Sequence, residues 1–112
     1  MATRVNRGEI WLYEFKPPDK RRPVLVLSRP DALRVLRTIL VAPITSQRRG
    51  SPAEVLLGIE EGLKVESAAN LDHVQSVQKN RLRHFVGTVS FQKMSEVCQA
   101  LSIATGCDAS IL

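Results

Sequence analysis

The chain has 112 residues, of which 44% are hydrophobic and 24% are charged, and these proportions are typical of a folded globular protein rather than a disordered one. Lysine and arginine total 16 against 11 aspartate and glutamate, which gives a net charge of +5. The excess lies in residues 1–50, which hold 11 basic and 4 acidic side chains, whereas residues 51–112 hold 5 and 7. We therefore expect a single domain over 1–112 whose basic half favours a polyanionic partner such as nucleic acid.

Composition also argues against several classes of protein. No apolar run approaches the ~20 residues of a membrane helix, and the first residues lack the apolar core of a signal peptide, so we expect a soluble cytoplasmic protein with no membrane partner. Cys98 and Cys107 are too few for a disulfide framework and lack metal-ligand spacing. Aromatic residues make up only 4% of the chain, so we expect at most one or two stacking faces for bases, from Trp11, Tyr13 and Phe15.

The first half of the chain predicts three strands joined by short turns. β-Branched, aromatic and aliphatic residues indicate strands over 9–15, 22–28 and 38–44. The turn over 16–21 contains two prolines, which make it stiff, and 31–35 can form one helical turn. Because Pro43 has no N–H, the third strand is expected to lie at a sheet edge or to carry a bulge there. A polar, basic loop over 45–52 follows.

The second half predicts shorter strands and one long helix. Its strands and turns are expected over 54–57 (strand), 58–62 (acidic turn), 65–77 (extended), 79–82 (helical turn) and 84–89 (strand). Ser90 is a suitable N-cap, and Gly106 is suited to end the helix. The spacing of apolar residues predicts a buried helical face, in which Met94 and Cys98 are core residues rather than cofactor ligands; the face comprises Phe91, Met94, Val97, Cys98 and Leu101.

Several short strands, tight turns and one C-terminal helix together predict a mainly β protein, a small barrel packed against that helix. Parallel α/β folds are disfavoured, because only one segment is long enough to form a crossover helix.

Arg22 lies at the start of one of the most apolar segments of the chain. Pro23 disfavours helix at the preceding residue, so Arg22 is expected to be extended at the mouth of the core. Thr45 and Ser46 follow the third strand. If the second and third strands pair, a phosphodiester between them would meet an arginine fork and a hydroxyl, which can stabilise the charge of a five-coordinate phosphorus. RNA supplies its own nucleophile, the 2′-OH. In the alternative interpretation, Lys20 to Arg22 form only a solvated basic loop.

Other chemistry finds little support. The chain has no glycine-rich phosphate loop, HExxH, paired CxxC or GxSxG motif, so no metal and no cofactor are expected. His73 and His84 are possible general bases, but a lone histidine near a strand end is more often a hydrogen-bonded structural residue.

Four motifs resemble, in the same order, those of the MazF/PemK/Kid family of toxin endoribonucleases. They are Arg7-Gly8-Glu9-Ile10-Trp11, Arg22-Pro23-Val24-Leu25-Val26-Leu27-Ser28, Pro43-Ile44-Thr45-Ser46-Gln47, and Glu66-Ser67 followed by Leu71 to Val77 and Lys79 to Leu82. The resemblance implies an SH3-like barrel of the MazF/Kid/CcdB type and a homodimer. It also implies metal-independent cleavage of single-stranded RNA at a short sequence, leaving a 2′,3′-cyclic phosphate and a 5′-hydroxyl, and a cognate antitoxin whose acidic C-terminal segment occupies the RNA groove.

Carried over by position, the resemblance makes Arg22 and Thr45 the catalytic residues. The substrate-binding residues that it implies are Phe15, Lys16, Asp19, Lys20, Ser46, Gln47, Arg48, Asp72, His73 and Gln75. One departure concerns the first hairpin loop, which in the family usually carries a Gly-x-Glu-Gln stretch. Here the shorter Pro17-Pro18-Asp19-Lys20 replaces it, so Asp19 is the one carboxylate left in the loop.

Three rival functions remain open at the level of sequence. A non-catalytic barrel would bind nucleic acid with strong salt dependence and create no new RNA ends. A gyrase poison of the CcdB type is disfavoured, because such toxins use a C-terminal Trp-Gly-Ile whereas this chain ends with Ser110-Ile111-Leu112. An inactive family member is the third possibility, because the first loop is shortened.

Overall fold

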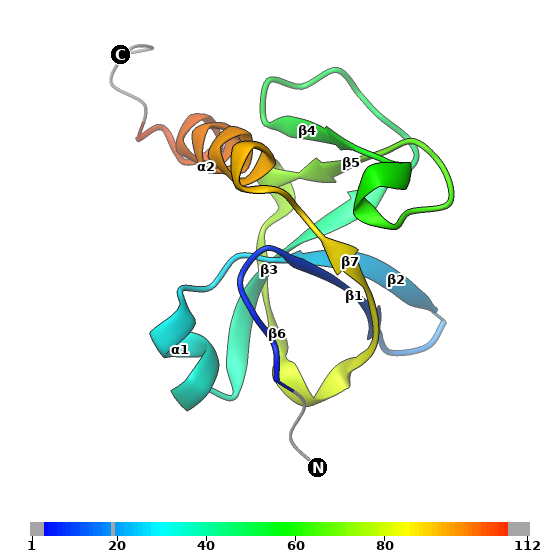
Figure 1. Cartoon of the computed structure of the whole chain (residues 1–112), viewed down its shortest axis with the longest axis vertical. Coiled ribbons are helices and arrows are strands. Elements are labelled where there is room, and N and C mark those ends of the chain that lie inside the picture. Colours follow the sequence, from blue (N-terminus) through cyan, green and yellow to red (C-terminus); the bar gives the residue numbers. More distant parts are fainter. Residues whose placement is uncertain (1–3, 19, 108–112) are drawn as a thin grey trace.

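The structure is a computed structural model that describes residues 4–18 and 20–107. Strands dominate it, and one long helix follows the last strand (Figure 1). The elements in chain order are β1 (Glu9–Glu14), β2 (Arg21–Val26), α1 (Pro30–Val35), β3 (Thr38–Thr45), β4 (Glu54–Leu57), the 3-10 helix η1 (Ile59–Glu61), β5 (Ser67–Asn70), η2 (Leu71–His73), β6 (Gln75–Gln78), η3 (Lys79–Arg81), β7 (Leu82–Thr88) and α2 (Phe91–Thr105).

The strands pair antiparallel in the order β4-β5-β3-β2-β1-β7, and β6 pairs with β3 below β5. Because η3 joins β6 directly to β7, the strands β7, β1, β2, β3 and β6 curl into a small barrel (Figure 1). The helix α2 covers the other end of the molecule, near β4 and β5. The expected class, a mainly β barrel with one long C-terminal helix, is confirmed.

Of the two alternatives predicted at Pro43, a sheet edge or a bulge, the edge is wrong, because β3 lies inside the sheet. It pairs with β2 on one side, and on the other side with β6 up to Val41 and with β5 from Ile44. Pro43 falls at the point where β3 passes from one partner to the next, so its missing N–H removes no bond from a continuous ladder. A break in pairing within a central strand therefore tolerates proline as well as an edge does.

Alternation along β1, β2 and β3 divides the apolar side chains between two cores. One core lies under α2 and includes Ile10, Leu25, Ala42, Ile44 and Val97. The other fills the barrel and contains Val5, Trp11, Tyr13, Val24, Val26, Leu33, Ile39, Val41, Val77 and Leu82. Trp11 and Tyr13 are both 6% exposed, so the expectation that they offer faces to bases is wrong.

The predicted ends of α2 are confirmed, whereas its predicted buried face is partly wrong. Ser90 Oγ accepts a hydrogen bond from Lys93 N at 3.1 Å, and Gly106 adopts a positive φ of 74° after the last turn. Val97 is buried, but Phe91 is 92% exposed and Cys98 is also exposed. Phe91 is the first residue of α2, and Ala100 takes a place in the core that the periodicity did not assign.

Local turn chemistry explains why the segment 65–77 is two strands rather than one. Asn70 Oδ1 accepts a hydrogen bond from Asp72 N at 2.9 Å, and this cap starts η2 between β5 and β6. Further along, η1 packs tightly against β7. A Cβ on Gly87 would overlap the carbonyl oxygen of Glu61, so only glycine fits at that point of β7. Among the described residues, no helix has the length and apolar character needed to cross a membrane.

Candidate active site

The pairing of β2 with β3 leads toward both Arg22 and Thr45. Its last pair joins Val24 to Pro43, and Arg22 and Thr45 each lie two residues beyond that pair along their own strands. On its other side, Arg22 pairs with Tyr13 of β1. Because side chains alternate along a strand, Arg22 and Thr45 lie on the same face of the sheet as Val24, whose side chain belongs to the core of the barrel. The two predicted catalytic residues therefore share one face at one end of the barrel.

Arg22 is exposed, whereas Val24, two residues further along β2, is fully buried. Its neighbour Arg21 points to the opposite face and pairs with Glu14 at 3.4 Å. Within the described ranges 4–18 and 20–107, no hydrogen bond or ion pair holds the Arg22 guanidinium. Among the described residues, nothing therefore competes with an anion for its donors.

Thr45 is half-buried at the end of β3, where it pairs with Ala68 of β5. Its Oγ1 accepts a hydrogen bond from Gln47 N at 3.1 Å. Since a hydroxyl can accept and donate at once, this bond leaves the Thr45 proton free for an acceptor outside. Ser46 and Gln47 follow as exposed residues, and the exposed Arg48 pairs with Glu66 at 3.0 Å.

A single carboxylate shapes the loop that follows Thr45. Glu54 Oε1 accepts hydrogen bonds from the backbone N–H groups of Arg49 (3.2 Å), Gly50 (2.8 Å) and Ser51 (3.2 Å), and its Oε2 accepts from Arg49 N at 3.0 Å. The bond from Arg49 is the main cause that holds the pKa of Glu54 below its ordinary value of 4.5, with the other two amides adding to it. The loop is thus fixed by its own downstream strand.

The same loop is joined to η2. Ser51 Oγ donates to Asp72 Oδ2 at 3.0 Å, while Asn70 Nδ2 and His73 Nδ1 lie 3.4 Å apart. These contacts bring the predicted residues Asp72 and His73, both exposed, beside the loop after β3. Gln75 is also exposed and lies next along the chain, where it pairs with Val41.

The β1–β2 hairpin carries the remaining predicted residues. Lys16 and Lys20 are exposed on either side of its turn, and Asp19 lies outside the described residues. Phe15 is half-buried and packs edge-on against Tyr13, with 4.7 Å between ring centroids. Of the three aromatic residues Trp11, Tyr13 and Phe15, Phe15 is therefore the one that stays partly exposed.

Sequence reasoning missed a cluster of arginines at the same end of the sheet. Glu14 lies 3.2 Å from Arg83, 3.4 Å from Arg21 and 4.0 Å from Arg81. The hydrogen bond from Arg83, followed by that residue's charge, holds the pKa of Glu14 below its ordinary value. Three cations share one carboxylate, which leaves a net positive charge around Glu14, on the face of the sheet opposite to that of Arg22. The β1–β2 hairpin brings Arg21 opposite Glu14, whereas Arg81 and Arg83 reach Glu14 only through the β1–β7 pairing, which no local pattern could have revealed.

His84 lies on the opposite face from Arg22. It pairs with Leu12, whose side chain alternates with that of Tyr13 along β1. This position separates the predicted alternative base from Arg22 by the thickness of the sheet.

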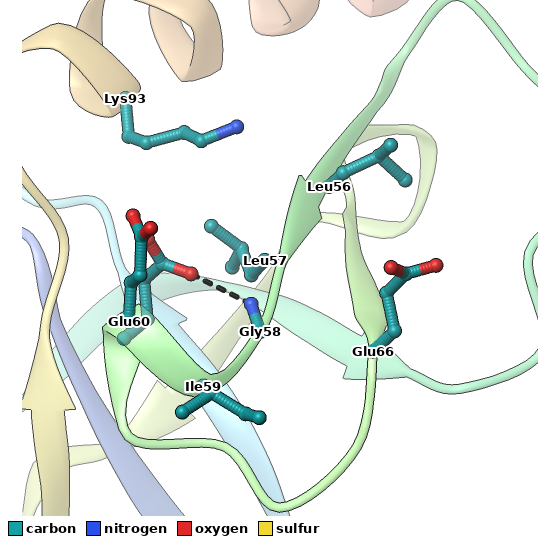
Figure 2. Close-up of a pocket in the computed structure, with 8 residues that line it drawn as sticks. Leu56, Leu57, Gly58, Ile59, Glu60, Glu66 and Lys93 are labelled. Carbon is teal, nitrogen blue, oxygen red and sulfur yellow. Dashed lines mark hydrogen bonds between the residues drawn. The ribbon is translucent and has the colours of Figure 1, made fainter.

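An acidic hollow of about 350 Å³ lies between β4, η1 and α2. Figure 2 shows Lys93 extending over it from α2 and Glu60 rising from η1 beneath. Its buried carboxylate, Glu61, accepts a hydrogen bond from Gly58 N at 2.6 Å, which gives it a structural role. With Glu66 as a third acidic residue in its lining, this hollow disfavours phosphate, in contrast to the end of the barrel that bears Arg22.

Comparison with known proteins gives a consistent result. A family model described as PemK-like, MazF-like toxin of type II toxin-antitoxin system matches residues 6–105. The chain is 42% identical over 104 residues to the probable endoribonuclease MazF5 of Mycobacterium tuberculosis. This alignment covers 90% of this chain and 93% of that protein. The chain is 30% identical to the probable endoribonuclease MazF2 of the same species, over 92% of this chain and 100% of that protein.

Solved structures agree with the sequence comparison. The Mycobacterium tuberculosis toxin MazF-mt6 resembles this chain with a TM-score of 0.81 at 28% identity, over 88% of this chain and 96% of that one. A chain of the MazE-MazF crystal structure from Deinococcus radiodurans has a TM-score of 0.77 at 27% identity, over 91% of this chain and 95% of that one. The protein therefore belongs to the family of PemK-like, MazF-like toxins of type II toxin–antitoxin systems.

Proposed function

We propose that this toxin is an endoribonuclease that cleaves single-stranded RNA, in particular mRNA, at a short specific sequence. The observation that supports the proposal is the pairing of β2 with β3, because Arg22 and Thr45 each lie two residues beyond its last pair, Val24 with Pro43, and by alternation on the same face of the sheet. The relatives named as endoribonucleases, at 42% and 30% identity, support the same activity.

The chemistry follows from the two side chains. The 2′-oxygen of the RNA attacks the adjacent phosphorus, the bond from phosphorus to the 5′-oxygen breaks, and the products are a 2′,3′-cyclic phosphate and a 5′-hydroxyl. The proton that the 2′-OH loses is balanced by the one that the 5′-oxygen gains. Arg22 can bind two non-bridging oxygens through its fork, and Thr45 can donate to one of them. Both interactions strengthen as negative charge builds on the five-coordinate phosphorus.

This arrangement needs no bound metal, because the arginine supplies positive charge where the phosphorane develops it. Glu14 is a poor general base, since its arginine partners lower the pKa of its carboxyl. We expect cleavage to persist at full rate in excess EDTA.

Recognition of bases is assigned to the surface around the two catalytic residues. Ser51 joins the loop after Thr45 to η2, and the β1–β2 hairpin leads directly into the strand that carries Arg22. We assign substrate binding to Phe15, Lys16, Asp19, Lys20, Ser46, Gln47, Arg48, Asp72, His73 and Gln75. Their exposed polar side chains can reach the edges of splayed bases.

The same basic surface suits the acidic C-terminal segment of a cognate antitoxin, which would compete with RNA for it. The MazE-MazF structure from Deinococcus radiodurans supports a protein partner of this kind. We also propose a homodimer. Val35, Ile59 and Phe91 are each more than three-quarters exposed in the single chain, and burial of such apolar side chains favours association. Sedimentation velocity of the purified toxin tests this.

The experiment that tests the function is sequencing of the 5′-hydroxyl ends of RNA treated with the purified protein. We expect new ends that share a short motif, each matched by a cyclic phosphate on the upstream fragment. A non-catalytic barrel or an inactive family member would bind RNA without creating such ends. That result would overturn the proposal.

A further inference from the structure

A second basic hollow lies at the other end of the barrel. It measures about 550 Å³ and is bounded by the segment before β1, by α1 and by η3. In Figure 1 these elements surround the lower part of the barrel, away from β4 and β5. Its charged lining side chains are four cations, and no carboxylate lines it among the described residues; the cations are Arg4, Arg7, Arg34 and Lys79.

Two of the four cations are held in place by neutral groups. Arg7 donates to the carbonyl oxygen of Leu27 and contacts Cys98 Sγ at 3.1 Å, and Lys79 Nζ donates to the carbonyl oxygen of Leu33 at 2.5 Å. A carbonyl orients a cation without neutralising its charge, so the field in the hollow is retained. Lys79 has three donors, so the bond to Leu33 leaves it donors for a ligand, whereas the Arg7 guanidinium also contacts Cys98 of α2 and lines a hollow beneath that helix.

The other two cations are exposed at the rim. Arg4 is exposed, and Arg34 is 69% exposed and pairs with Asp31 at 2.5 Å. Arg29 and Arg37, both exposed, flank α1 and extend the same sign of charge beyond the hollow. A polyanion approaching this face meets cations over a surface wider than one phosphate.

This hollow is separate from the site of Arg22. Arg7 contacts Leu27, five residues beyond Arg22 along the chain, which at 3.3–3.4 Å per residue is about 17 Å. A stacked strand spaces its phosphates by about 3.4 Å, so about five nucleotides would bridge the two positions.

We propose that this hollow binds the phosphate backbone of RNA outside the cleavage motif. Guanidinium forks match phosphate oxygens, which suits the three arginines of the lining. No aromatic side chain lines the hollow within the described ranges, so it offers no stacking face and would hold RNA without reading its bases. The lining comes from a loop, a helix and a 3-10 turn rather than a free strand edge, so it offers an acidic peptide no ladder of backbone groups. The choice of RNA rests on the proposed function.

Salt-dependent binding tests the proposal without depending on cleavage. The probes are fully 2′-O-methylated oligonucleotides, which have no nucleophilic 2′-OH. Their lengths are about 3 nucleotides, too short to bridge the two positions at a spacing of ~3.4 Å each, and about 16 nucleotides, long enough to do so. The variant Arg4→Gln/Arg34→Gln leaves the carbonyl-bonded Arg7 and Lys79 intact. Its matched control, Lys64→Gln/Lys93→Gln, also removes two charges, one of them from an i,i+3 ion pair, because Lys93 pairs with Glu96. Thermal unfolding verifies that both variants fold.

We expect wild-type protein to bind the long probe with a steeper salt dependence than the short one. For the long probe, the variant Arg4→Gln/Arg34→Gln, here called the hollow variant, should show a shallower slope of log Kobs against log salt. The slope should fall by about 1.4, which is about 0.7 for each of the two phosphate contacts removed. Its binding of the short probe and both slopes of the control should stay unchanged. Equal losses in the two variants would reduce the effect to net charge and overturn the proposal. Displacement of the long probe by a polyglutamate peptide of equal charge from wild type but not from the hollow variant would assign the hollow to an acidic peptide instead.

If RNA binds as expected but is never cut, the proposed function fails while this proposal stands. If RNA is cut, and the long and short probes show equal slopes with the wild-type protein, the proposed function stands while this proposal fails.

Discussion

Ser51 Oγ donates a hydrogen bond to Asp72 Oδ2 across 3.0 Å, and this contact joins the loop after Thr45 to η2. Ser51 Oγ also accepts from Ala53 N at 3.0 Å, and Ser51 N donates to Glu54. One residue thus ties together the two segments to which we assign base recognition.

Removing that tie should weaken substrate binding more than chemistry. We expect Ser51→Ala to raise KM for RNA about fivefold, the worth of one ordinary hydrogen bond, and to leave kcat almost unchanged. Ser51→Thr keeps the hydroxyl and should restore KM. In the Asp72→Ala background, Ser51→Ala should cost less than it does alone, because the partner is already absent. Full additivity of the two substitutions would show that the contact has no role.

Glu54 should make stability depend on pH. Its pKa in the folded chain lies below the ordinary value of 4.5, so its stabilisation is present above pH 4.5 and is lost as the pH falls through the folded value. We expect Glu54→Gln to lower the urea midpoint at pH 7, and the gap from wild type to shrink steadily below pH 4.5. Glu60→Gln changes the net charge equally and should leave the midpoint at pH 7 unchanged. A gap that is constant from pH 7 to pH 3 would contradict this assignment.

The close approach of η1 to β7 predicts a large effect of one methyl group. A Cβ at Gly87 overlaps the carbonyl oxygen of Glu61, so Gly87→Ala should destabilise the fold by about 1–3 kcal/mol. Gly58→Ala is the matched control, because its added Cβ meets nothing within 4 Å. Urea unfolding measures both. Equal midpoints for the two variants would show that η1 moves away from β7 at little cost.

The sequence was sufficient for the strands of the first half and for both ends of α2, because these depend on local features. A β-branched and aromatic run predicts β1, and Ser90 and Gly106 mark the helix ends. The errors occur where tertiary structure decides. Pro43 looked like an edge residue because a sequence does not show where one strand changes partners, and Phe91 fitted the helical period but extends beyond the core.

The candidate site divides in the same way. Arg22 and Thr45 each lie two residues beyond the last pair of β2 with β3, and their catalytic role stays a prediction. The arginines around Glu14 were missed, since Arg83 reaches it from β7, 69 residues away along the chain. The network from Glu54 to Asp72 was also missed, because exposed polar residues give no signal of their partners until the backbone places them.

The rate of single-turnover RNA cleavage by Arg22→Ala tests the central claim most directly. Arg21→Ala is the matched control, because Arg21 is the adjacent exposed arginine on the opposite face. We expect Arg22→Ala to slow cleavage about 10²–10³-fold and Thr45→Ala about tenfold, with unchanged melting temperatures, while Arg21→Ala cleaves at nearly the wild-type rate. Cleavage by Arg22→Ala at the wild-type rate would contradict the assignment of Arg22 to the reacting phosphate.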